Sequence, residues 1–199
     1  MTEKDIDAVC SHLQNVPYEQ LLPVCRKFSC DSRTTQTQLG AVASIGDRLR
    51  RIPEFTGRLF RVADLYAWLA SLDVLKPWTL YGLDAIVTKD RCFDFLRTIT
   101  DGMKYEGSEC AYAFTETPSS VCWSILTTND GNLVVEHRLV CLNLWYEHPF
   151  LAVHDAGALI VHAERLRSSL AAVNVDPGKC LRGYYEKLSS AHAKVSRRC

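Results

Sequence analysis

Apolar residues in the first hundred positions recur at intervals of three and four, the spacing that places side chains on one face of an α-helix. The clearest run, which ends before Pro53, consists of Leu39, Val42, Ile45 and Leu49. Similar runs begin near residues 2, 17, 56 and 90, and together they predict a mainly helical half over 1–104. Gly40 and Gly46 lie near one another on the helix before Pro53, so we expect another element to approach it closely.

The period changes to two after residue 105, which is typical of β-strands. Apolar and polar positions alternate over 109–115, 120–127 and 132–146. Asn129-Asp130-Gly131 between the last two segments tolerates positive φ and predicts a hairpin turn. We therefore expect a three-stranded antiparallel β-meander, with Leu139, Cys141 and Trp145 on one face of its last strand.

The rest of the chain predicts two further helices. Residues 150–172 are apolar almost all round, which predicts a long helix buried against the sheet. Asp176-Pro177 offers a cap followed by proline, so a final polar helix through about residue 194 is expected. The order of elements indicates an α+β fold in a single domain, 1–199, with a helical layer (1–104) and a β-meander with packed C-terminal helices (105–199).

Composition narrows the class of protein. The chain has 199 residues, 47% of them hydrophobic and 23% charged, as in an ordinary globular protein. Its 23 basic and 23 acidic residues cancel, so binding to nucleic acid or a membrane is not favoured by bulk charge. The longest runs without charge are 13 residues, shorter than the roughly 20 that cross a bilayer. We expect a cytoplasmic or otherwise intracellular protein, because acids stand where a secretory signal would be basic.

The cysteines raise the question of a catalytic thiol. Nine cysteines with irregular spacing, in a chain expected to be intracellular, are interpreted as reduced thiols. Cys122 precedes a tryptophan, and His137 follows beyond the expected hairpin, so the two are the candidates for a nucleophile and a base. A thiolate needs electropositive, exposed surroundings, whereas Cys122 falls inside a strand, which favours a structural role.

Two other sites are candidates for binding chemistry. Cys10, His12, Cys25 and Cys30 form a loose set of sulfur and imidazole groups that zinc accepts, but their spacing matches no standard finger and a core role is favoured. His137 lies on an otherwise apolar strand face, so it either has a hydrogen-bond partner there or lines a pocket between the sheet and the long helix. No cofactor motif is found, and none is expected.

Charge is unevenly distributed along the chain. Residues 31–61 hold six arginines against three acids, and residues 108–150 hold five acids against Arg138. The arginines around one short connection are Arg48, Arg50, Arg51, Arg58 and Arg61. Arginine suits bidentate contacts with carboxylate or phosphate, so the cluster is either a docking patch or a solvated helix face. Trp68 and Trp78 follow it and are aromatic residues of the type that dominates interfaces.

These patterns predict a non-enzymatic protein with a regulatory or adaptor role. The expected partner is another protein with an acidic surface, and self-association into a homo-oligomer is possible on the same grounds. Three alternatives stay open. They are a small-molecule-binding protein or enzyme with a pocket at His137, RNA binding through the arginines, and a thiol hydrolase that uses Cys122.

Overall fold

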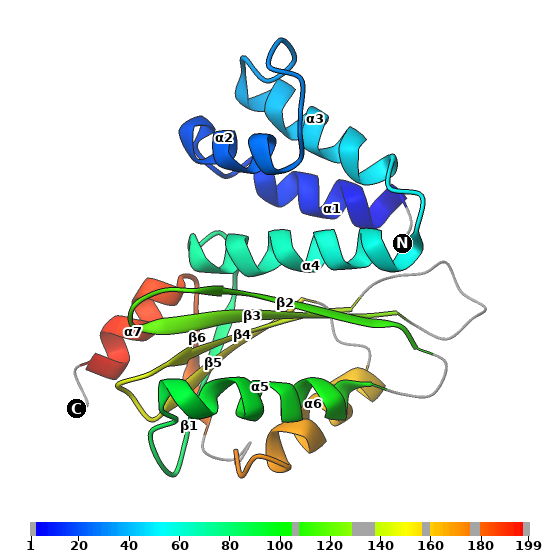
Figure 1. Cartoon of the computed structure of the whole chain (residues 1–199). Coiled ribbons are helices and arrows are strands. Elements are labelled where there is room, and N and C mark those ends of the chain that lie inside the picture. Colours follow the sequence, from blue (N-terminus) through cyan, green and yellow to red (C-terminus); the bar gives the residue numbers. More distant parts are fainter. Residues whose placement is uncertain (1–2, 105–107, 129–137, 157–159, 176–179, 197–199) are drawn as a thin grey trace.

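A computed structural model describes residues 3–104, 108–128, 138–156, 160–175 and 180–196. One antiparallel sheet lies between two helical layers (Figure 1). Helices α1 (Glu3–Leu13), α2 (Tyr18–Lys27) and α3 (Gln38–Arg50) stack on α4 (Phe55–Ser71), and α4 covers one face of the sheet. Helices α5 (Lys89–Met103) and α6 (Ile160–Ala171) cover the other face, and α7 (Leu188–Ser196) lies beside the end of the sheet.

The sheet has six described strands in the order β2-β3-β4-β5-β1-β6, and every neighbouring pair is antiparallel. Their bounds are β1 Trp78–Gly82, β2 Cys110–Glu116, β3 Ser120–Thr127, β4 Arg138–Trp145, β5 Phe150–Ala156 and β6 Cys180–Tyr185. β2 therefore forms one edge of the sheet, and β3 and β4 lie inside it.

Both faces of the sheet carry a hydrophobic core. Every residue of β3 and β4 is buried. Cys122, Leu126, Cys141 and Trp145 belong to the core under α4, whereas Trp123, Ile125, Val140 and Leu142 belong to the core under α5 and α6. Alternate residues of a strand point to opposite faces, so one continuous buried segment serves both cores.

Helices α1 and α3 pack closely at a glycine, as their sequences predict. A Cβ on Gly46 would lie 3.0 Å from the Cys10 sulfur of α1. Thr37 begins α3, where its side-chain oxygen accepts a hydrogen bond from the Gly40 N–H at 3.1 Å. The expectation that the first half is mainly helical is confirmed, and so are the strands near 109–115 and 120–127.

The size of the sheet was underestimated by the sequence pattern. The expected meander is present as β2, β3 and β4, but β5, β1 and β6 extend it. Leu139, Cys141 and Trp145 do share one face of β4. The hairpin residues 129–131 lie outside the described residues, and so does 132–137, the first part of the expected last strand.

The expected helix over 150–172 was wrong in its first half. Phe150–Ala156 is strand β5, and the helix begins at Ile160. A strand that is buried on both faces is apolar throughout, so its sequence resembles a buried helix. The final helix was also wrong in part, because Cys180–Tyr185 is strand β6 and α7 covers only Leu188–Ser196.

Strand β1 was missed because it has only five residues, and the helical spacing before it hid the change of period. In the described part of the chain, no helix combines the length and apolar character required to cross a bilayer.

Candidate functional site

Three arginines and a lysine from α2, α3 and α4 meet at one surface hollow of about 420 Å³, which we name the basic pocket. It is lined by Lys27, Phe28, Ser29, Arg48, Arg51, Ile52, Pro53 and Arg61. None of these lining residues is acidic. The three guanidinium groups, which have no carboxylate among the lining residues, repel one another, so the pocket favours an acidic ligand.

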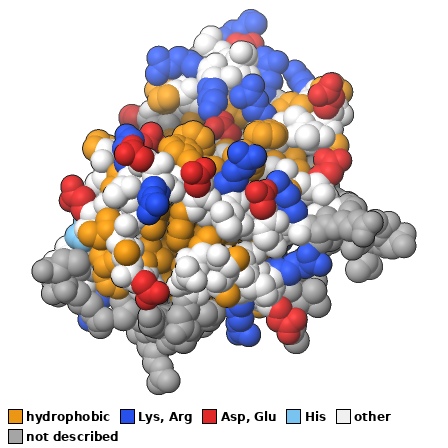
Figure 2. All heavy atoms as spheres, turned by 60° about the horizontal axis from the view of Figure 1, so that its bottom comes forward, with side chains coloured by type: hydrophobic (Ala, Val, Ile, Leu, Met, Phe, Trp, Pro, Cys, Tyr) orange, Lys and Arg blue, Asp and Glu red, His pale blue; other side chains and the backbone are white. Residues whose placement is uncertain are grey.

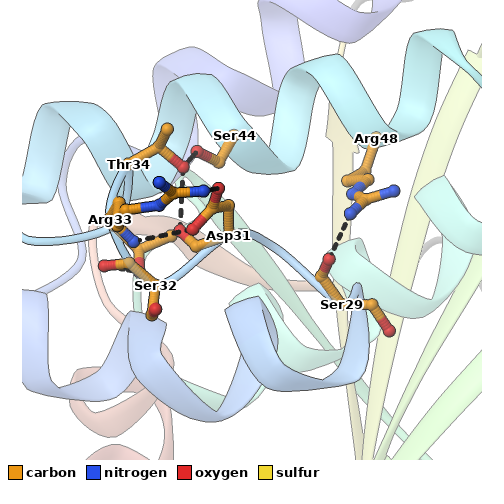
Figure 3. Close-up of polar contacts among 8 residues, drawn as sticks. Ser29, Asp31, Ser32, Arg33, Thr34, Ser44 and Arg48 are labelled. Atoms are coloured by element: carbon orange, nitrogen blue, oxygen red, sulfur yellow. Dashed lines mark hydrogen bonds and ion pairs between the residues drawn. The ribbon is translucent and has the colours of Figure 1, made fainter.

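The loop between α2 and α3 fixes the position of Arg48. Its Nη2 donates to the Ser29 carbonyl at 2.5 Å, and Figure 3 shows the side chain reaching from α3 toward that oxygen. Thr34 holds the same loop against α3, because its hydroxyl lies 2.8 Å from that of Ser44 and donates to the Asp31 carbonyl at 2.8 Å. The remaining donors of Arg48 are therefore held at a defined place beside the pocket.

Arg51 and Arg61 complete the pocket without a carboxylate partner. Arg51 is exposed at the end of α3, and the Arg61 guanidinium lies 5.9 Å from the centroid of the Phe28 ring. Within the described ranges, neither these two residues nor Arg48 forms an ion pair. Lys27 differs from them, since its ammonium pairs with Asp64 at 2.5 Å.

Arg50 and Arg58, which the sequence grouped with these arginines, do not line the pocket. Arg50 turns toward α1, where it binds Glu3 at 2.6 Å and Asp7 at 2.8 Å. Arg58 donates from its Nη2 to the Ile52 carbonyl at 2.8 Å. Both guanidinium groups hold the helical layer together, so they have fewer donors for a partner.

A second hollow of about 400 Å³ adjoins the basic pocket and shares Lys27 and Arg61 with it. We name it the aromatic groove, and its other lining residues are Phe60, Asp64, Tyr112, Ala113 and Phe114. Phe60 is 51% exposed and Phe114 45% exposed. Figure 2 turns the side of the molecule with α5 and α6 toward the reader. Hydrophobic side chains gather on the left half of this view, with charged ones among them. Exposed aromatic rings beside cations are typical of binding surfaces.

Ring stacking fixes the aromatic side chains of β2. The Tyr112 and Trp123 rings are stacked at 4.9 Å, and Phe114 stacks on the same indole at 5.6 Å. The Phe93 ring of α5 meets Phe114 edge-on at 4.9 Å. The groove is therefore lined on this side by rings that need little reorganisation before a ligand binds.

Cys122 lies in the core under α4 and not at an exposed site. It is 1% exposed, and its thiol donates to the Asn143 Oδ1 at 3.0 Å. Burial raises the pKa of Cys122 to about 12, so the thiolate is strongly disfavoured at neutral pH. This environment supports the structural interpretation of the cysteine.

The candidate zinc residues are partly brought together. The thiols of Cys25 and Cys30 are close enough to share a hydrogen bond, and burial raises the pKa of both. Cys10 instead packs against Gly46, and the His12 ring meets Tyr66 at 5.9 Å. Among the residues that the structure describes, no group of three or more His, Cys, Asp or Glu side chains could hold a metal ion. Seven cysteines are free thiols, namely Cys10, Cys25, Cys30, Cys92, Cys110, Cys122 and Cys141.

The small-molecule alternative rested on His137, which lies outside the described residues. A hollow of about 540 Å³ does occur on the α5 side, between the loop after β1 and the end of α6. It is lined by residues such as Leu83, Ile86, Arg91, Phe95 and Val173. Most of this lining comes from the loop and from α5, so the hollow is a surface feature and not a pocket between sheet and helix.

The structure places the two tryptophans expected at an interface at different depths. Trp78 is fully buried in β1, and Trp68 is half-buried against the core. Sequence reasoning missed Phe60 and Phe114 as exposed aromatics. Phe60 stands off the apolar stripe of its helix, which is a signal that could have been used, whereas the exposure of Phe114 depends on the place of β2 in the sheet.

The chain matches no protein-family model, and no curated protein matches it in sequence.

Proposed function

We propose that the protein works by binding an acidic segment of another protein across the basic pocket and the aromatic groove. The observation that carries the proposal is the convergence of Arg48, Arg51 and Arg61, without carboxylate partners in the described structure, beside the exposed rings of Phe60 and Phe114. Guanidinium groups bind carboxylates through paired N–H donors, and exposed rings supply apolar contact area next to them.

The basic pocket and the aromatic groove contribute different interactions to binding. The basic pocket supplies charge, which accelerates encounter and selects acidic partners. The aromatic groove supplies apolar area that an acidic chain would have to match with its own apolar side chains. A partner segment would therefore contain both Asp or Glu and aliphatic residues. No step of catalysis is required of any side chain on this surface.

The test is a binding measurement with a synthetic peptide in which Glu alternates with Val, labelled with a fluorophore and read by anisotropy. Arg51→Glu with Arg61→Glu reverses two exposed charges of the basic pocket, so the acidic peptide is repelled where it was attracted. We expect this double variant to weaken binding about tenfold or more, and tenfold corresponds to about 1.4 kcal/mol. The melting temperature should stay nearly unchanged, because neither side chain is buried.

A matched control changes net charge equally elsewhere. Arg91→Glu with Arg97→Glu alters two exposed residues of α5, on the opposite face of the sheet. This variant should bind the peptide like the unaltered protein. Equal losses in both variants would mean that overall charge alone drives binding. A single-stranded RNA homopolymer is tested in the same assay. If it binds as tightly as the peptide and its affinity falls steeply with salt, the surface binds nucleic acid and the proposal is contradicted.

A further inference from the structure

Strand β2 is an edge strand whose outer side faces the aromatic groove. It pairs with β3 on one side, and no described strand pairs with it on the other. An unpaired edge presents a row of N–H and C=O groups that can accept an additional strand. Natural proteins usually cover such an edge or place charge on it, so an uncovered one beside a hollow is a candidate for strand addition.

The register shows which residues direct their backbone outward. At one end of the strand pair the Thr128 N–H donates to the Glu109 carbonyl at 3.0 Å, and at the other the Thr117 N–H donates to the Ser120 carbonyl at 2.8 Å. Odd-numbered residues of β2 therefore bond to β3, since the two directions alternate along an antiparallel strand. The N–H and C=O groups of Tyr112 and Phe114 consequently point away from β3, toward the open edge of the sheet.

The surroundings of this edge differ on its two sides. Toward α4, a strand laid beside β2 would meet Phe60, the guanidinium of Arg61 and the ion pair between Lys27 and Asp64. Toward α5, it would meet the rings of Phe93 and Phe114. Side chains of a strand alternate between its two faces, so acidic and apolar residues in alternation match this edge. The aliphatic stems of glutamates would also cover Phe60.

We infer that the acidic partner segment binds as an extended strand added antiparallel or parallel to β2, with its backbone bonded to Tyr112 and Phe114. Its glutamate or aspartate side chains lie toward Arg61, and its apolar side chains lie on Phe114. This inference rests on the proposed function and specifies the conformation and residue pattern of the partner.

N-methylation of the peptide tests the backbone contacts without altering the protein. One version of the Glu-Val peptide carries N-methyl groups at every Glu, and a second carries them at every Val. Within a strand only one of these sets of N–H groups faces β2. We expect one version to lose binding about tenfold or more, because several backbone hydrogen bonds to β2 are removed, while the other version binds like the parent.

A second measurement locates the contact on the protein. The amide hydrogens of Tyr112 and Phe114 should exchange more slowly when the unmethylated peptide is bound, whereas those of Ala111 and Ala113 should change little because they already bond to β3. Strand addition would be overturned if both methylated versions bound like the parent peptide and exchange at Tyr112 and Phe114 were not slowed. The proposed function would still stand.

Two further results would be decisive. If the parent peptide does not bind at all, the proposed function and this inference both fail. If light scattering shows a dimer in which the Tyr112 amide is already protected without peptide, the edge is occupied by a second copy of the chain, and the inference of an acidic peptide strand is wrong.

Discussion

Asp73 binds the backbone N–H of Ser189, a residue 116 positions later in the chain, at 3.0 Å from one carboxylate oxygen and 3.2 Å from the other. Ser189 is in the first turn of α7, where N–H groups lack partners within the helix. The turn after α4 therefore caps the last described helix. Asp73 adopts a positive φ of 64° in doing so, a conformation that Asp and Asn tolerate better than most residues.

Replacing Asp73 tests this cap. Asp73→Ala should lower the free energy of unfolding by about 1–2 kcal/mol, because the cap is lost and alanine is less favourable at positive φ. Asp73→Asn keeps an acceptor oxygen and the tolerance of positive φ, so it should cost less than half as much. Urea unfolding of the two variants measures the difference, and equal losses would show that the cap contributes little.

The different roles of Arg50 and Arg51 can be separated by stability measurements. Arg50 binds Glu3 and Asp7 of α1, and these partly exposed ion pairs contribute roughly 1 kcal/mol in total at low salt. Arg50→Ala should therefore lower the melting temperature, and the difference should shrink in high salt. Arg51→Ala is the matched control and should leave the melting temperature unchanged. A larger effect of Arg51→Ala would contradict the assignment of these two residues.

Cys122 should resist alkylation in the folded protein. Its thiol is buried, and the raised pKa leaves almost no thiolate at neutral pH. Iodoacetamide followed by peptide mass spectrometry should label Cys122 only in denaturant, whereas Cys30, which is partly exposed, should be labelled without denaturant. Rapid labelling of Cys122 in the native protein would reopen the thiol hydrolase alternative.

His154 should make the fold sensitive to acid. Burial lowers the pKa of this histidine, whose Nδ1 lies 2.9 Å from the Pro77 carbonyl, and its Nε2 is buried without a partner among the described residues. The unfolded chain takes up the proton near pH 6.5, before the folded chain does, so the free energy of unfolding should fall as the pH decreases below that value. One histidine contributes a slope of at most about 1.4 kcal/mol per pH unit.

Urea unfolding at several pH values between about 7.5 and 5 measures this slope. His154→Gln should reduce it. His12 is a second contributor, because burial lowers its pKa too, and His12→Gln determines its share. An unchanged slope in His154→Gln would show that the imidazole of His154 is not the group that titrates.

The sequence predicted those elements whose apolar residues keep a regular period. Helix α3 packs one face onto a core, and its apolar spacing shows it; α4 keeps helical spacing although it lies between the other helices and the sheet. Strand β3 was predicted although every residue of it is buried, because Val121, Trp123 and Ile125 recur at every second position. Strand β5 was not predicted, because apolar residues fill consecutive positions at its start and no alternation distinguishes it from a helix. Strand β1 was not predicted, because two buried residues, Trp78 and Leu80, are too few to establish the two-residue period of a strand.

The sequence predicted an arginine-rich site, but it did not predict which arginines line the pocket. The excess of arginine between residues 48 and 61 is visible in the sequence, and Arg48, Arg51 and Arg61 do line one pocket. The sequence could not show that Arg50 turns toward Glu3 and Asp7, because that depends on the crossing of α1 and α3. It also could not show that β2 lies at the edge of the sheet, since strand order is set by long-range pairing.

The burial of β3 and β4 on both faces creates a problem of alignment, because hydrophobic alternation does not specify which residues of these strands face α4. A shift of one residue would exchange the two faces without exposing either to water. Directional polar contacts remove this ambiguity. Ser124 donates to the Ala63 carbonyl of α4, and the Trp123 indole donates to Thr100 of α5. A shifted strand would leave both donors without these partners, so two hydrogen bonds select a single alignment for the centre of the sheet.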